Sequence, residues 1–287
     1  PHEGDYFRMT GDIDFAVATG FRGVGAGYNP AIGFGGIFDG QNHTIRNLKI
    51  QAVAFDGDGK ATTDGSYTYS GLFNNILATG VVRNLNIGSD CSFSHWGPGG
   101  SVSGYNMGLI ENCRSYAPQS AITDYVGGIT GFNTGTLRGC YNAGALTLGR
   151  VYAGGIAGAN TGRIELCQND ADVTGSAFNA FITSKTQNAI GGIAGGTNTD
   201  ASVIISCLNQ GTVTGARQVG GIIGVCNQSV LRGNINTGMV NCWLTDPTQG
   251  AMAGNLTRLE GENNFFDGSV VVAGAALSSG RPGFTSL

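Results

Sequence analysis

The apolar positions of this chain recur in columns 27 residues apart, and glycine and asparagine separate them. One phrase is written three times, as SGYNMGLIENC from Ser103, TGFNTGTLRGC from Thr130 and AGANTGRIELC from Ala157. Self-similarity at a fixed period of this length is typical of supersecondary units stacked into a solenoid. Two columns of predicted interior side chains are Ile110, Leu137, Ile164, Ile204 and Leu231, and Leu146, Val173, Val213 and Val240.

A third column places one small or apolar side chain in each coil: Leu48, Leu85, Cys113, Cys140, Cys167, Cys207 and Asn234. Its first two members are assigned from the twin phrases IRNLKI and VRNLNI. Parallel neighbours in register lie ~4.8 Å apart, whereas a disulfide needs Cβ atoms about 3.8 Å apart in a twisted geometry. We therefore expect these cysteines to be reduced, buried and equivalent to small hydrophobic residues.

Short runs of β-branched residues, broken by Gly and Asn every five to eight positions, predict short strands joined by tight turns. No window shows a 3.6-residue apolar period, which excludes helical repeats. The sequence thus predicts an all-β chain folded as one parallel β-helix of about seven or eight coils. We expect residues 1–32 to form an N-terminal cap or first coil, 33–241 the repeat coils, and 242–287 a C-terminal cap and tail. The segment from Asp246 should abandon the repeat.

Polar columns support the same register. We expect amide ladders at turns, where asparagine tolerates left-handed backbone, at Asn106, Asn133 and Asn160, and at Asn142, Asn169, Asn209 and Asn236. We expect positive φ at the glycine column Gly108, Gly135 and Gly162. A charge column of Glu111, Arg138 and Glu165 should alternate in sign on adjacent coils. A ligand-binding role for the asparagines is the alternative to this structural interpretation.

Composition narrows the function classes. Gly accounts for 51 of 287 residues, 12% are charged, and the net charge is −4 with 15 Lys plus Arg. The absence of a basic patch argues against nucleic-acid binding. No stretch approaches the roughly 18 consecutive apolar residues that span a bilayer, so we expect no membrane insertion. We also expect no cofactor and a monomeric chain.

The phrases GGITGFNTG, GGIAGANTG and GGIAGGTN resemble the GLUG repeat, and YFRMTGDIDF followed by FGGIFDGQNHTIRNLKI resembles the opening coils that precede such repeats. The resemblance covers roughly residues 6 to 241. Proteins of this kind include immunoglobulin A metalloproteases and adhesin-like surface proteins of gut bacteria. The resemblance implies a right-handed β-helix of the pectin-lyase-like type on a secreted or cell-surface protein. It does not imply catalysis, because fold alone does not decide function.

Catalytic motifs are missing from the sequence. A zinc protease needs H-E-x-x-H, but the only histidines are His2, His43 and His95, none in that pattern. Polysaccharide hydrolysis needs two carboxylates about 5–10 Å apart. Asp170 and Asp172 have no acidic counterparts one coil away. The acidic residues of FDGDGKATTDG (Asp56, Asp58 and Asp64) lack the glycine that a calcium loop requires at its sixth position.

Extra residues gather at one corner of successive coils, eight residues beyond the Leu/Cys column. Solenoid insertions on one face often form the binding face. The aromatic and imidazole side chains at this corner are our candidate binding residues: Tyr67, Tyr69, His95, Trp96, Phe178, Phe181 and Trp243. They would stack on sugar rings or anchor a protein partner; alternatively, they cover coil edges.

The leading hypothesis is a non-catalytic module that serves as a binding or adhesion scaffold for a host glycoprotein or glycan. The alternatives are the scaffold portion of an immunoglobulin A protease-like metalloprotease, a polysaccharide-cleaving β-helix enzyme, and a stalk without any ligand. In the leading hypothesis no residue is catalytic and none binds metal.

Overall fold

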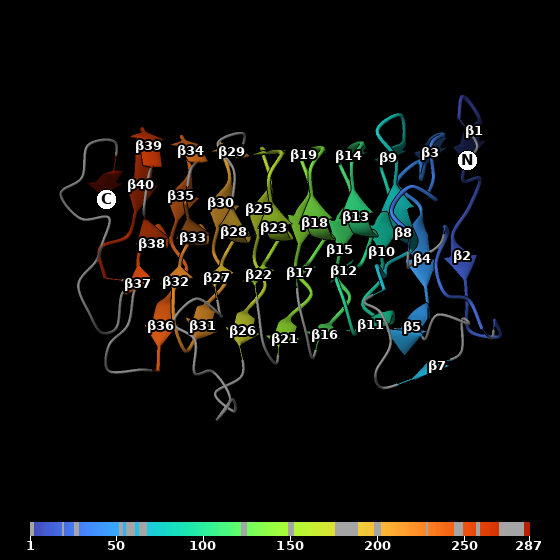
Figure 1. The fold of residues 1–287 in the computed structure, drawn as a ribbon, viewed down its shortest axis with the longest axis horizontal. Helices are drawn as coiled ribbons and strands as arrows, with labels where there is room; N and C mark the ends of the chain where they lie inside the picture. Colours follow the sequence, from blue (N-terminus) through green and yellow to red (C-terminus); the bar gives the residue numbers. More distant parts are fainter. Residues whose placement is uncertain are drawn as a thin grey trace.

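The computed structural model describes residues 3–18, 20–25, 29–51, 54–55, 61–62, 68–121, 125–148, 152–175, 189–197, 202–227, 229–243, 249–256, 259–269 and 284–287. These residues form a parallel β-helix of about seven turns and contain no helical segment, as the repeat predicts. The rod runs from the N-terminus to the C-terminus without doubling back, so each coil contacts its neighbours in sequence (Figure 1).

The described strands form five parallel sheets that run along the rod, and we number them in the order in which the chain passes through a coil. Sheet 1 contains β1 (Tyr6–Arg8), β3 (Ile37–Asp39), β9 (Val81–Arg83), β14 (Leu109–Glu111), β19 (Thr136–Arg138), β24 (Arg163–Glu165), β29 (Ser202–Ile205), β34 (Ser229–Arg232) and β39 (Leu259–Glu262). Sheet 2 contains β2 (Ile13–Asp14), β4 (Thr44–Arg46), β10 (Asn86–Ile87), β15 (Arg114–Ser115), β20 (Tyr141–Asn142), β25 (Gln168–Asn169), β30 (Leu208–Asn209), β35 (Ile235–Asn236), β40 (Asn264–Phe266) and β41 (Phe284–Ser286).

The remaining three sheets complete the coil. Sheet 3 contains β5 (Lys49–Gln51), β11 (Ser92–His95), β16 (Gln119–Ala121), β21 (Leu146–Leu148), β26 (Val173–Gly175), β31 (Val213–Gly215) and β36 (Val240–Cys242). Sheet 4 contains β12 (Gly99–Gly100), β17 (Val126–Gly127), β22 (Ala153–Gly154), β27 (Ile190–Gly191), β32 (Val219–Gly220) and β37 (Gln249–Gly250). Sheet 5 contains β8 (Phe73–Ile76), β13 (Ser103–Asn106), β18 (Thr130–Asn133), β23 (Ala157–Asn160), β28 (Ala194–Thr197), β33 (Ile223–Cys226) and β38 (Ala253–Leu256). A short antiparallel pair, β6 (Ala54–Phe55) and β7 (Ala61–Thr62), lies outside these sheets.

The predicted interior columns are confirmed by the strand register. Ile110 is level with Leu137, and Leu137 with Ile164. The column of Leu146 and its valines is also in register. Both columns are fully buried but belong to separate apolar clusters. The larger one is lined mainly by sheets 1, 2 and 5, with Ile50 and Phe93 of sheet 3 in its first coils, and the smaller one lies between sheets 3 and 4.

An asparagine ladder runs between these two clusters. Asn142, Asn169, Asn209 and Asn236 are fully buried, and each of the first three donates its amide to the next at 2.8–2.9 Å. Opposite them lie the second glycines of the GG phrases. A Cβ placed on Gly155 would come within 2.1 Å of Asn169 Cγ. The ladder lies at the turn from sheet 2 to sheet 3, as expected, since each amide also donates to the carbonyl two residues further on. It forms a narrow polar waist across the coil.

The glycine column Gly108, Gly135 and Gly162 does not have positive φ, which corrects our expectation. A Cβ on Gly135 would lie 2.1 Å from the carbonyl oxygen of Gly108 in the preceding coil. These glycines are needed because adjacent backbones approach closely there. A column of left-handed residues stands instead one position before the Leu/Cys column: Asn84, Asn112, Gly139, Leu166, Ser206 and Gly233.

The first coil does not pair with the second in the register that the twin phrases IRNLKI and VRNLNI predict. Leu85 is level with Cys113, as expected, since Asn86 pairs with Arg114. Leu48 instead lies beside Cys91, because Lys49 pairs with Ser92, and the Leu48 N–H donates to Cys91 Sγ at 3.3 Å. The expectation that Leu48 shares the column of Leu85 is therefore wrong.

The repeat also continues further than expected. Strands β37, β38, β39 and β40 pair in parallel with β32, β33, β34 and β35, so residues 249–266 contribute another turn. The expectation that the segment from Asp246 abandons the repeat is therefore wrong. Strand β41 then pairs with β40 at the end of sheet 2.

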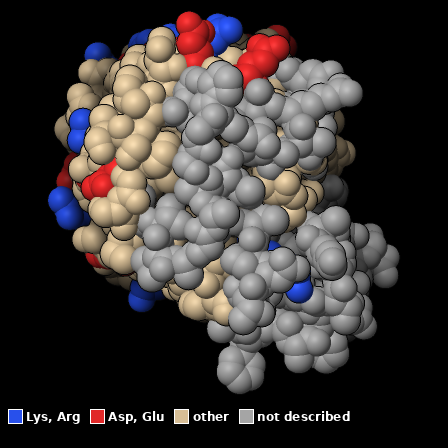
Figure 2. All heavy atoms as spheres, turned by 90° about the vertical axis from the view of Figure 1, so that its left-hand side faces the viewer, with Lys and Arg blue, Asp and Glu red and all other residues tan. Residues whose placement is uncertain are grey.

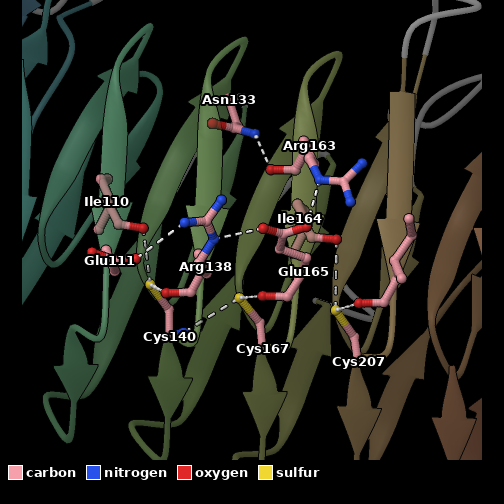
Figure 3. Close-up of polar contacts among 11 residues, drawn as sticks. Ile110, Glu111, Asn133, Arg138, Cys140, Arg163, Ile164, Glu165, Cys167 and Cys207 are labelled. Carbon is pink, nitrogen blue, oxygen red and sulfur yellow. Dashed lines mark hydrogen bonds and ion pairs between the residues drawn. The ribbon is translucent and has the colours of Figure 1, made fainter. Parts of the chain in front are cut away.

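The thiol and charge columns lie together at the turn from sheet 1 to sheet 2 (Figure 3). All seven cysteines are free thiols and six are buried; for example, Cys140 Sγ donates to the Ile110 carbonyl at 3.5 Å. Outside them, Arg138 pairs with Glu111 at 3.3 Å and with Glu165 at 2.6 Å. The alternating charges confirm the predicted register. Viewed from the C-terminal end, the charged side chains lie mainly along the outer rim of the described surface (Figure 2).

Candidate functional site

Five aromatic rings form a continuous row along the outside of the rod. We call it the aromatic row, and its members in order of contact are Tyr69, Tyr105, Phe132, Tyr125 and Tyr152. The first two rings are stacked, with centroids 5.3 Å apart and planes at 21°. The next contacts are tilted or edge-on, at 5.3, 5.5 and 5.4 Å between centroids. Each ring thus contacts its neighbour in the row.

Two columns of the repeat supply these rings. Tyr105 and Phe132 are paired outward positions of β13 and β18 in sheet 5. Tyr125 and Tyr152 each precede a strand of sheet 4, and those strands are paired through Val126 and Ala153. The parallel register repeats each ring one coil further along, so the two columns interleave into one row.

A glycine sets the far end of the row. Gly196 occupies the column of Tyr105 and Phe132, two coils beyond β18. A Cβ on Gly196 would lie 2.4 Å from Cδ1 of Tyr152. The ring of Tyr152 therefore lies against bare backbone, and any larger residue at this position would displace it.

All five rings are half-buried, so each keeps part of its surface open to solvent. Burial raises the pKa of Tyr69, with a smaller contribution from neighbouring Tyr105, and burial also raises the pKa of Tyr152. Both phenols stay protonated at neutral pH and can donate and accept hydrogen bonds. The row combines apolar ring surface with polar hydroxyl groups, which suits ligands that present both.

Of the candidate residues from the sequence, Tyr69 belongs to this row. His95 is 1% exposed and lies inside the coil. Its Nε2–H donates to Gln119 Oε1 at 3.0 Å, because an amide oxygen can only accept, and its Nδ1 accepts from the Ser70 hydroxyl at 2.7 Å. Burial lowers the pKa of His95 to about 4. Its bonds hold adjacent coils together.

The two tryptophans occupy one column but are not brought together. Trp96 follows His95 and Trp243 follows Cys242, two residues that end strands of sheet 3. The register between these strands runs through five coil steps, which is ~24 Å at ~4.8 Å per step. Trp96 is half-buried, whereas Trp243 is 43% exposed. Tyr67, Phe178 and Phe181 lie outside the described residues.

Other residues considered for chemistry serve the scaffold or lie elsewhere. Asp170 accepts the Tyr141 hydroxyl at 2.9 Å, Asp172 accepts the Thr212 N–H at 3.0 Å, and His43 lies 3.5 Å from Asp12. Among the described residues no group of three or more His, Cys, Asp or Glu could hold a metal, and no helix could span a membrane. His2, Asp56, Asp58 and Asp64 lie outside the described part of the chain.

Four members of the aromatic row were missed by our sequence reasoning. The signal was present, because Tyr105 and Phe132 are 27 residues apart and so are Tyr125 and Tyr152. Tracing aromatic residues along the period would have identified both columns. Their interleaving could not be seen from spacing alone, since it depends on how sheets 4 and 5 meet.

No protein-family model, no curated protein and no solved structure matches the chain.

Proposed function

We propose that this chain is a non-catalytic β-helix module that binds glycans, or the glycan part of host glycoproteins, on its aromatic row. The observation that carries the proposal is the continuity of five half-exposed rings on successive coils. Its resemblance to GLUG-repeat proteins supports a place on a secreted or cell-surface bacterial protein. In that setting the module acts as an adhesin-like scaffold.

Sugar chemistry matches the row. A pyranose ring has an apolar face of C–H groups that packs on an aromatic face, while its hydroxyls need hydrogen-bond partners. The tyrosine hydroxyls of the row provide such partners. Because the rings follow one another along the rod, a linear glycan laid along the axis can contact several of them at once, and weak contacts add up.

The rings of the aromatic row are held in place before a ligand binds, which favours binding. Each ring contacts a neighbouring ring. Tyr105, Phe132, Tyr125 and Tyr152 also stand on a strand, or next to one, whose backbone is paired on both sides, and Tyr69 precedes the bridge between Ser70 and Gly99. Side chains already held in place lose little conformational entropy when a ligand binds. A smooth rod without such rings would act only as a spacer.

The experiment is a binding screen of the chain against plant, bacterial and mucin glycans, with immunoglobulin A alongside. The proposal predicts saturable binding to one glycan class, and loss of that binding in the variant Tyr105→Ala/Phe132→Ala. A blank screen would overturn the proposal and favour a stalk. Circular dichroism and thermal unfolding of the variant establish that it keeps the fold.

A further inference from the structure

A shallow groove of about 590 Å³ lies on sheet 2, a face of the coil separate from the aromatic row. Its lining includes Arg46, Asn86, Gly88, Arg114 and Tyr116, which come from three successive coils. The volume is within the range of about 300–1,000 Å³ typical of small-molecule sites.

Gly88 lies in the middle of the groove lining. Ile87 pairs with Ile45 on one side and with Ser115 on the other. The residues that follow are therefore also level, which places Gly88 between Arg46 and Tyr116. A Cβ on Gly88 would lie 2.5 Å from Asp90 Oδ1, so the missing side chain leaves room for that carboxylate, which also lies 3.8 Å from Arg46. The groove lies between the Arg46 guanidinium and the Tyr116 phenol ring.

The two arginines differ in their partners. Arg46 pairs with Asp12 at 3.1 Å and lies 3.8 Å from Asp90, so carboxylates of this chain neutralise it. The Arg114 guanidinium lies 5.7 Å from the centre of the Tyr141 ring and has no carboxylate partner among the described residues. Arg114 is exposed and retains its capacity to bind an anion.

The aromatic wall of the groove is held in place. Tyr116 is 38% exposed and packs against Tyr141 with ring centroids 5.9 Å apart. The Tyr141 hydroxyl donates to Asp170 at 2.9 Å, which fixes that second ring. On the opposite side, the Asn86 side chain donates to the Asn42 carbonyl at 2.6 Å and keeps its own amide oxygen available as an acceptor.

We propose that this groove binds an acidic sugar residue, with its anionic group on Arg114 and its ring against Tyr116. One guanidinium without a carboxylate partner suits a single planar or tetrahedral anion, which it can bind through two parallel N–H donors. Asn86 and the Ser89 hydroxyl, which also lines the groove, suit the sugar hydroxyls. This site is independent of the proposed function of the aromatic row.

Sialyllactose, sulfated lactose and lactose test the proposal, because all three contain lactose, which carries a carboxylated sialic acid residue in the first, a sulfate ester in the second and no anionic group in the third. The full chain is titrated with each sugar, and binding is monitored by NMR chemical shifts. We expect both acidic sugars, or the carboxylated one alone, to bind at least tenfold more tightly than lactose. Binding to both assigns the site to anions in general, whereas binding to sialyllactose alone assigns it to the carboxylated sialic acid residue.

Variants locate the binding. Arg114→Gln and Tyr116→Ala should each weaken it about tenfold, and Tyr116→Phe should retain it. The control Arg232→Gln changes an exposed arginine that pairs with Glu262 at 3.2 Å and should have no effect. Equal affinity for lactose, no binding of any of the three sugars, or full binding by Arg114→Gln would overturn the proposal. The variant Tyr105→Ala/Phe132→Ala should bind sialyllactose normally, which separates this site from the aromatic row.

Discussion

Gly155 lies directly against Asn169 across the narrow waist of one coil. A Cβ on Gly155 would come within 2.1 Å of Asn169 Cγ and 2.3 Å of the Gly192 carbonyl oxygen. The same contact recurs at Gly128 with Asn142, Gly192 with Asn209, and Gly221 with Asn236. The GG phrases of the sequence are thus the steric counterpart of the asparagine ladder.

The replacement Gly155→Ala should therefore destabilise the rod strongly. Overpacking a tight interior typically costs 1–3 kcal/mol, and here a backbone oxygen blocks relaxation, so we expect about 3 kcal/mol. Urea unfolding measures the loss. Gly11→Ala is the matched control, because Gly11 has φ outside the left-handed region and open space around its Cβ position; its stability should change by about 0.5 kcal/mol or less. Equal effects at both positions would contradict this explanation.

Leu166 is the unfavourable member of the left-handed column. It has φ +57° and is 62% exposed, while asparagine, glycine or serine occupies the same position in the neighbouring coils. Left-handed backbone costs an ordinary L-residue roughly 1–2 kcal/mol, and asparagine less. Leu166→Asn should therefore raise the free energy of unfolding by about 1 kcal/mol. Leu208→Asn, in strand β30, should bring no gain; a loss of stability at Leu166→Asn would refute the strain argument.

His95 should make stability depend on pH. Its native pKa of about 4 lies below the 6.5 of an unperturbed histidine, so the unfolded chain binds a proton first as the pH falls. The stabilisation is complete above pH 6.5 and is lost between about 6.5 and 4, by about 3 kcal/mol at 1.36 kcal/mol per pH unit. Urea unfolding at a series of pH values measures it. His95→Gln should flatten the curve in this window, and an unchanged slope would mean that another group causes it.

The buried thiols should be inert. Burial raises the pKa of Cys91 and of Cys226 to about 11, and raises the pKa of Cys113 well above its ordinary value. Only Cys242 is partly exposed. A thiol-exchange reagent should therefore titrate one cysteine in the native protein and seven in guanidinium chloride. Cys242→Ser should reduce the native count to zero; several reactive thiols would contradict the burial of the column.

Much of the fold could be predicted from the sequence, because residues one period apart in a β-helix lie side by side in adjacent coils. Ile110 and Leu137, one period apart, indicate the interior column, and Glu111 and Arg138, also one period apart, indicate that opposite charges are neighbours on the outside. The first coil could not be phased, since the turn between β3 and β4 is two residues longer than that between β9 and β10. The repeated phrase IRNL therefore marks different places in the two coils.

The sequence alone also could not show why glycine is required at its repeated positions. A sequence shows that Gly135 recurs at a fixed position, but not whether φ or a neighbouring backbone requires it. The sequence also places Trp96 and Trp243 at the same corner of the coil, but it is the strand register that shows how many coils separate them. The aromatic row could not be predicted either, because its rings come from two sheets and the sequence does not show how those sheets meet.

Titration of the glycan identified in the screen against three forms of the chain decides whether the aromatic row is the binding surface. These are the parent, Tyr105→Ala/Phe132→Ala, and Trp96→Ala/Trp243→Ala. If the aromatic row is the binding surface, the first double variant should lose at least tenfold in affinity and the tryptophan variant should bind like the parent. Parent-like binding by Tyr105→Ala/Phe132→Ala, with its fold intact, would contradict the account.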